Sequence, residues 1–181
     1  TVKEEGNKFT IDADELIGGH VYLDMPSVGA TINTILVAVR AKGTTILENA
    51  AKEPEIVNIA TFLNNMGAKI RGAGTSTIRI IGVDHLKDSF TEVIPDRIET
   101  GTYMIAGALA GNQLKITNVI PDHVESLTLK LKEMGCPITI GEDSITISRG
   151  KHLKPVNIKT LGYPGFPTDL QQPLTTLLTY C

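Results

Sequence analysis

The sequence predicts an α/β protein built from a repeated unit of strand, helix, strand, helix and two-stranded hairpin, written βαβαββ. First, the pattern of residues from Gly43 to Ile80 recurs in outline from Leu114 to Ile147. Second, short β-branched runs alternate with segments whose apolar residues recur at helical spacing. Third, aromatic residues make up only 4% of the chain and Trp is absent, so the core must consist of aliphatic side chains, which suits small units packed repetitively.

The first unit can be followed element by element. Pro54 and Gly67 bracket its second helix, as expected for a helix start and a helix end. Two runs around Gly6-Asn7, residues 1–5 and 8–11, predict the closing hairpin of an earlier unit. The expected elements that follow are strand 20–23, helix 30–40, strand 44–48, helix 54–66, and a hairpin of strands 69–71 and 77–81.

A second unit follows, and a third begins. Pro121 and Gly135 bracket a helix as Pro54 and Gly67 do. The expected elements are strand 90–94, helix 102–109, strand 113–117, helix 121–134, strands 138–140 and 144–148, then strand 156–159 and helix 170–180. Because no complete set of units frames the sequence, we expect it to be a piece of a longer protein.

The charge, apolar runs and cysteine spacing of the sequence exclude several classes of function. The 181 residues carry 17 Lys+Arg against 20 Asp+Glu, a formal net charge of −3, with no basic run that would attract nucleic acid or an anionic membrane. There is no apolar run of about 20 residues, and the first residues, Thr1 to Glu5, are expected to form neither a signal peptide nor a transit peptide. Cys136 and Cys181 lack metal-ligand spacing and predict free thiols. We therefore expect a cytoplasmic protein that acts on small molecules, without a metal or cofactor.

One candidate site lies at the first helix of the first unit. Ser27-Val28-Gly29-Ala30-Thr31 combines small residues and hydroxyls at a helix N-terminus, which suits a phosphate or diphosphate. The alternative is that Ser27 only caps the helix. Glu53 and Glu55 begin the next helix, where acidic residues favour the macrodipole.

Two further loop-to-helix junctions carry charged side chains. In Asp96-Arg97-Ile98-Glu99, the Arg97 guanidinium could grip a carboxylate or phosphate, or the segment could be a solvated turn capped by Asp96. In Phe166-Pro167-Thr168-Asp169, the Asp169 carboxylate could orient or deprotonate a hydroxyl, or Thr168 or Asp169 could cap the helix. Polar residues at equivalent places in three repeats favour convergence of the three loops on one cleft.

Several strings resemble one known family. They are Ser27 to Thr31, Gly43 to Val57, Met66 to Lys69, Pro95 to Thr102, and Phe166 to Asp169. Together they resemble the UDP-N-acetylglucosamine 1-carboxyvinyltransferases of the enolpyruvyl transferase family, and the resemblance covers the whole chain. It implies two lobes, each an inside-out α/β barrel of three βαβαββ units, with substrates between them. The crossover would fall near Ile94-Pro95. Residues 1–94 would then be the rear part of one lobe and residues 95–181 the front part of the second, both incomplete.

The resemblance also implies an activity. The enolpyruvyl group of phosphoenolpyruvate would pass to the 3′-hydroxyl of UDP-N-acetylglucosamine with release of phosphate, the first committed step of peptidoglycan synthesis, in a monomeric enzyme. Asp169 matches the carboxylate that contacts this hydroxyl and is the expected base. The segment that holds the UDP part matches Met25, Pro26, Ser27, Val28 and Gly29. The charged residues that line or brace the cleft match Glu53, Glu55, Asp96, Arg97 and Glu99.

The sequence lacks several of the catalytic and binding residues that are typical of the family. The flexible loop with the general-acid cysteine, a Lys-Asn pair and the arginines that hold phosphoenolpyruvate have no counterparts here, and neither Cys136 nor Cys181 has the catalytic context. We therefore expect this chain to be inactive alone. Two other functions stay open: 3-phosphoshikimate 1-carboxyvinyltransferase, which shares the fold and the chemistry, and a non-catalytic binding module.

Overall fold

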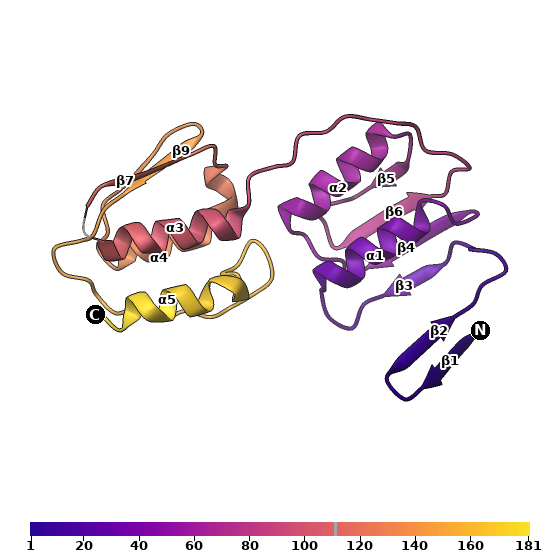
Figure 1. Ribbon diagram of the computed structural model, residues 1–181, viewed down its shortest axis with the longest axis horizontal. Coiled ribbons are helices and arrows are strands. Elements are labelled where there is room, and N and C mark those ends of the chain that lie inside the picture. Colours follow the sequence, from indigo (N-terminus) through magenta and orange to yellow (C-terminus); the bar gives the residue numbers. More distant parts are fainter. Residues whose placement is uncertain (111) are drawn as a thin grey trace. The chain divides into compact units, whose positions relative to one another are not determined.

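A computed structural model describes residues 1–110 and 112–181, which form two compact units, Thr1–Glu92 and Val93–Cys181 (Figure 1). In each unit, helices cover one face of a β-sheet, so the predicted α/β class is confirmed. In the described part of the chain, no helix combines the length and the apolar character that crossing a membrane requires.

The first unit contains the predicted repeat in full. Its elements are β1 (Val2–Glu5), β2 (Lys8–Ile11), β3 (His20–Tyr22), α1 (Val28–Ala38), β4 (Thr44–Glu48), α2 (Pro54–Asn65), β5 (Lys69–Arg71) and β6 (Thr77–Ile81). Strands β1 and β2 form an antiparallel hairpin. The other four strands form a sheet in the order β3-β4-β6-β5, in which β3 is parallel to β4 and the other pairs are antiparallel.

The two faces of this sheet differ sharply. Leu47, Ile78 and Ile80 are fully buried and belong to the same apolar core as Ile35 of α1 and Ile56 of α2. The alternate residues of β5 and β6, among them Lys69, Arg71 and Arg79, are exposed. The helices therefore share the core with the inner face, while the outer face stays open, as expected for an inside-out arrangement.

The second unit repeats most of this pattern. Its elements are α3 (Arg97–Ala110), β7 (Leu114–Thr117), a 3₁₀ turn η1 (Pro121–Val124), α4 (Glu125–Glu133), β8 (Ile138–Ile140), β9 (Ser144–Ile147), η2 (Thr168–Leu170) and α5 (Gln171–Leu178). Equivalent positions share unusual backbone: Asn49 and Asn118 each have φ of 56°, and Gly67 and Gly135 have φ of 101° and 94° after their helices. The internal repeat therefore extends to individual turns.

Two predicted strands are wrong. Residues 90–94 and 156–159 are not strands, and the sheet that the structure describes in the second unit has the order β7-β9-β8. A strand needs a neighbour, and β3 has one because β4 follows α1 and pairs with it. In the third repeat, the described residues contain no strand at the position of β4. The first segment crosses between the units, and its Phe90 and Val93 side chains are 89% and 78% exposed.

Helix boundaries also differ from the prediction. Helix α1 begins at Val28 because Ser27 caps it, and α3 begins at Arg97 because Asp96 caps it. The predicted helix 121–134 is divided into η1 and α4. Side chains therefore set the first turns of α1 and α3, and a proline begins η1, which apolar periodicity alone does not show.

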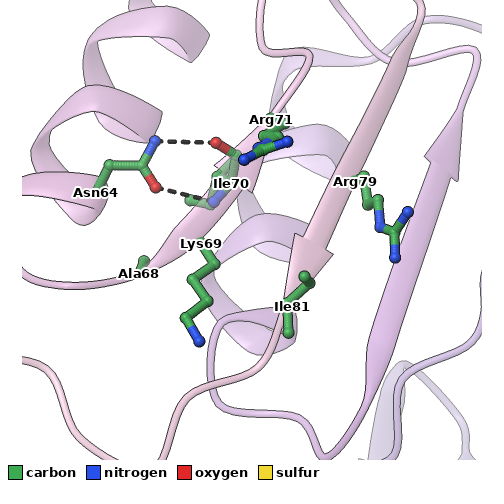
Figure 2. A pocket seen from close by; sticks show the side chains of 7 residues that line it. All are labelled: Asn64, Ala68, Lys69, Ile70, Arg71, Arg79 and Ile81. Atoms are coloured by element: carbon green, nitrogen blue, oxygen red, sulfur yellow. Dashed lines mark hydrogen bonds between the residues drawn. The ribbon is translucent and has the colours of Figure 1, made fainter.

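The edge strand β5 is protected by a side chain. The Asn64 amide donates to the carbonyl of Ile70 at 3.0 Å and accepts from its N–H at 2.8 Å, so it takes the place of a neighbouring strand (Figure 2). Unpaired edges are templates for association with another chain. Asn64 closes the middle of this edge.

Candidate functional site

In the first unit, the two helix N-termini lie at the same end of the sheet (Figure 1). Because β3 and β4 are parallel, their carboxyl ends lie at the same end of the sheet. Helix α1 follows β3 and helix α2 follows β4, so both helices begin at that end. The two loops are tied together by the Asn49 side chain, whose Nδ2 donates to the Leu23 carbonyl at 2.8 Å. This pairing brings the Ser27 segment and the Glu53-Pro54-Glu55 segment to one end of the unit.

Ser27 caps α1, and the start of the helix remains able to bind an anion. The Ser27 Oγ accepts from the Ala30 N–H at 3.3 Å, so the capping interpretation is confirmed. The N–H groups of Val28 and Gly29 have no acceptor among the residues described, and they lie at the positive end of the helix. Met25, which is 71% exposed, and Pro26 lead into this turn on the surface.

Gly29 is not required by the fold. A Cβ added there would meet no atom within 4 Å, and the backbone is in an ordinary helical conformation. Glycine near a helix start lowers helix stability by about 1 kcal/mol relative to alanine. Gly29 thus costs helix stability, but it leaves open space beside the N–H groups of Val28 and Gly29. Such open space allows a ligand to approach these two amides closely.

The Thr31 hydroxyl does not belong to this site. Thr31 is fully buried, and its Oγ1 accepts from the Ala51 N–H at 3.0 Å. The expectation that this hydroxyl would help to hold a phosphate is wrong, because it faces the loop before α2. Its role is to fix the first turn of α1 to that loop.

Replacing Thr31 with Val tests this structural role. The side chains are similar in shape, but Val leaves the buried Ala51 N–H without its acceptor, so the full-length protein is expected to lose about 1–3 kcal/mol of unfolding free energy. Urea unfolding measures the change. Thr34→Val, on the same helix with no hydrogen bond shown for its hydroxyl, should change stability by under about 0.5 kcal/mol. Equal effects of the two substitutions would contradict the assignment.

Glu53 and Glu55 begin α2 around Pro54. Glu53 occupies the N-cap position without a side-chain cap bond, and Glu55 lies in the first turn. The Glu53 Oε2 is buried and has no hydrogen-bond partner within residues 1–110 and 112–181. Both carboxylates lie where the helix macrodipole favours negative charge, as the sequence predicts.

In the second unit, Asp96 positions the start of α3. Its Oδ1 accepts from the N–H groups of Ile98 at 2.7 Å and Glu99 at 3.1 Å, so the capping interpretation is confirmed. The adjacent Arg97 guanidinium lies over the ring of Tyr163, 5.9 Å from its centroid. The Glu99 side chain is exposed on the first turn. At this junction Asp96 therefore caps α3, and the guanidinium of Arg97 contacts the ring of Tyr163.

Asp169 differs from the other junction residues because it caps nothing. It lies in η2, where no side chain makes a cap hydrogen bond, so neither Thr168 nor Asp169 is an N-cap of the expected kind. Its carboxylate is exposed and has no partner among the residues that the structure describes. Phe166 and Leu170, which are 5% and 1% exposed, anchor the chain on either side. The carboxylate is therefore presented to solvent on an anchored segment.

Two of the three predicted junctions come together. Arg97 of α3, Tyr163 and Pro167 line a cavity of about 10 Å³ with His123 of η1, so the starts of α3 and α4 and the 163–170 segment meet in the second unit. That volume holds about one water molecule and no substrate. The Ser27 junction belongs to the first unit. Tyr163 is not among the residues predicted for the site. The sequence feature that could have pointed to it is an aromatic residue within a Pro- and Gly-rich loop.

Cys136 has no catalytic character. It is 4% exposed, and burial raises the pKa of its thiol above the ordinary value. A buried, protonated thiol neither attacks nor exchanges protons with a substrate. This agrees with the expectation that Cys136 lacks the context of the catalytic cysteine. Among residues 1–110 and 112–181, no three His, Cys, Asp or Glu side chains are grouped to hold a metal ion.

Comparison with known sequences identifies relatives along the whole chain. A family model described as EPSP synthase (3-phosphoshikimate 1-carboxyvinyltransferase) matches residues 1–180. The chain is 60% identical over 178 residues to UDP-N-acetylglucosamine 1-carboxyvinyltransferase 2 of Listeria monocytogenes, and 58% identical to the protein of that name in Bacillus cereus. Each match covers 98% of this chain but only 42% of the relative, so the chain spans less than half the length of these curated proteins.

Solved structures show the same fold. The enolpyruvyl transferase NikO from Streptomyces tendae matches with a TM-score of 0.82 and 26% identity, over 100% of this chain and 46% of its own. EPSP synthase from Acinetobacter baumannii matches with a TM-score of 0.60 and 21% identity, over 99% of this chain and 42% of its own. The predicted enolpyruvyl transferase-like α/β fold, incomplete in this chain, is therefore confirmed.

Proposed function

The chain belongs to the EPSP synthase family, whose model matches residues 1–180, and from this membership we propose that the full-length protein is a UDP-N-acetylglucosamine 1-carboxyvinyltransferase. The observation that carries the proposal is 60% identity over 98% of the chain to a protein of that name. The family also contains 3-phosphoshikimate 1-carboxyvinyltransferases, but the EPSP synthase structures matched are only 21% identical.

The start of α1 supports a nucleotide-sugar substrate. A UDP-sugar carries a diphosphate, and two unpaired helix N–H groups beside an exposed Gly29 suit a diphosphate oxygen. We assign Met25 to Gly29 to this contact. Glu53 and Glu55 lie at the same end of the first unit, at the start of α2, and we assign them to the residues that line or brace the cleft.

Asp169 is the proposed base. Among the residues that the structure describes, its exposed carboxylate has no hydrogen bond that would have to be broken before it meets a substrate hydroxyl. Asp169 would take the proton of the 3′-hydroxyl as its oxygen bonds to C2 of phosphoenolpyruvate, and a general acid that this chain does not supply would protonate C3. Loss of a proton from C3 and of phosphate from the resulting adduct would then restore the double bond. Arg97 and Glu99 would lie at the border of this cleft, held by the cap that Asp96 forms.

Other parts of the proposal concern the whole protein. Residues 1–94 would be the rear part of one lobe and residues 95–181 the front part of the next, with UDP-N-acetylglucosamine and phosphoenolpyruvate between the lobes. The enzyme would act as a cytoplasmic monomer in peptidoglycan synthesis, and so in cell-wall biogenesis, cell shape and cell division, without nucleic acid or membrane as a partner. This chain alone would be inactive, because Cys136 is buried with a raised thiol pKa and so is unsuited to act as the general acid.

Phosphate release from phosphoenolpyruvate tests the proposed function. The full-length protein is expected to release phosphate with UDP-N-acetylglucosamine as acceptor and at least about 100-fold more slowly with shikimate 3-phosphate, because an acceptor without the diphosphate leaves the α1 amides unpaired. The control is the 181-residue chain, which should release none. Preference for shikimate 3-phosphate would contradict the assignment, and nucleotide-sugar binding without turnover would indicate a binding module.

A further inference from the structure

A second concave site lies at the β5 edge of the first sheet, on residues that the proposed function does not use. A cavity of about 510 Å³ is lined by Lys69 and Arg71 of β5 and Arg79 of β6, with apolar surface from Ala68 and Ile81 (Figure 2). This volume is in the range of small-ligand sites. Three cationic side chains thus share one cavity in a protein whose net charge is −3.

The two arginines are direct cross-strand partners. Arg71 is opposite Arg79 in the antiparallel β5–β6 register. Like charges placed directly opposite destabilise a sheet. In the described part of the chain, no acidic side chain forms an ion pair with either arginine or with Lys69. The positive charges of Lys69, Arg71 and Arg79 are therefore available to an anionic ligand.

Protection of the sheet edge does not account for these charges. Charged residues often guard edge strands, and Lys69 and Arg71 are on one. However, Arg79 is on β6, which lies between β4 and β5. The outward backbone groups of β5 at Ile70 are already held by Asn64.

The second repeat shows that the scaffold does not need the cations. There, Ile138 is opposite Ile147 as Ile70 is opposite Ile80, so the registers correspond. The next pair in the second repeat is Thr139 with Thr146, where the first has Arg71 with Arg79. Paired threonines on facing strands stabilise a sheet. The same hairpin is thus built with and without the charges.

We propose that Lys69, Arg71 and Arg79 bind a small ligand that carries a diphosphate group. Guanidinium forks match phosphate oxygens in pairs, and Lys adds a compact third charge. Three positive charges suit the roughly two to three negative charges of a diphosphate near neutral pH. Ala68 and Ile81 offer an apolar wall for the rest of the ligand. None of these residues belongs to the Ser27 or Asp169 segments, so the site stands whether or not the proposed function holds.

Titration with inorganic pyrophosphate, followed by calorimetry, tests the site in the full-length protein saturated with UDP-N-acetylglucosamine, so that the proposed diphosphate contact at α1 is already occupied. The variant Arg71→Thr/Arg79→Thr installs the pair that the second repeat already uses, so folding is expected to be retained. Affinity for pyrophosphate should fall about 10- to 100-fold. Phosphate release in the enzyme assay should stay within about twofold of the parent, since neither arginine touches the proposed cleft.

The control removes the same charge elsewhere. Lys3→Thr/Lys8→Thr takes two cations from exposed strand positions in the β1–β2 hairpin, outside the cavity, and should leave pyrophosphate affinity unchanged. Unchanged affinity in the arginine variant, or an equal loss in the lysine variant, would overturn the proposal. Arginine-dependent binding to phosphatidylserine vesicles without binding to pyrophosphate would overturn it as well, in favour of a membrane-surface role.

Discussion

Asp169→Asn in the full-length protein is expected to lower kcat by about 10²- to 10⁴-fold, the contribution of a positioned general base. The substitution keeps the shape of the side chain but removes the carboxylate that would take the hydroxyl proton. Asp169 is exposed and makes no hydrogen bond within the described chain, so unfolding free energy should change by under about 0.5 kcal/mol. Loss of turnover without loss of stability is the signature of a residue that contacts substrate.

The measurement is phosphate release over a range of nucleotide-sugar concentrations. KM for UDP-N-acetylglucosamine should stay within about threefold, because the proposed contacts with its diphosphate are made by the α1 segment and not by Asp169. Asp122→Asn is a matched control, since Asp122 is an exposed aspartate in η1, the other 3₁₀ turn of the second unit. A kcat for Asp169→Asn equal to that of the control would remove Asp169 from the chemistry.

The repeat could be read from the sequence because its signals are local. Pro54 and Gly67 mark the ends of α2, and Asn49 and Asn118 end their strands with positive φ. Each signal acts within one turn of the chain. Strand pairing is not local, which explains why segment 90–94 satisfies a strand pattern without forming a strand.

The sequence predicts which residue types make up the candidate site. It does not predict whether each side chain faces solvent or the protein interior. Ser27 and Thr31 are both hydroxyl residues of one motif, yet Ser27 caps the surface end of α1 and Thr31 bonds to a buried amide. Sequence spacing does not separate these roles, because the position of the β4–α2 loop decides them. Asp169 likewise matched an N-cap pattern, but the 3₁₀ turn at Thr168–Leu170 leaves its carboxylate without a cap bond.

Gly29→Asp should separate the stability of α1 from its proposed function. Asp has an open position at the second residue of the helix and a favourable interaction with the macrodipole. Replacing Gly there should raise unfolding free energy by about 0.5–1 kcal/mol. The same carboxylate would meet the diphosphate at the Val28 and Gly29 amides, so affinity for UDP-N-acetylglucosamine should fall by about 100-fold or more.

Calorimetric titration with UDP-N-acetylglucosamine and urea unfolding of the same full-length variants measure the two effects. Gly29→Ala is the control for size, because it gives the helix a Cβ without a charge and should stabilise the protein while costing less affinity than the aspartate. Stabilisation with weakened binding cannot arise from misfolding, so this opposite pair of changes would place the ligand at the helix start. Full affinity in Gly29→Asp would instead show that Ser27 only caps α1 and that the diphosphate binds elsewhere.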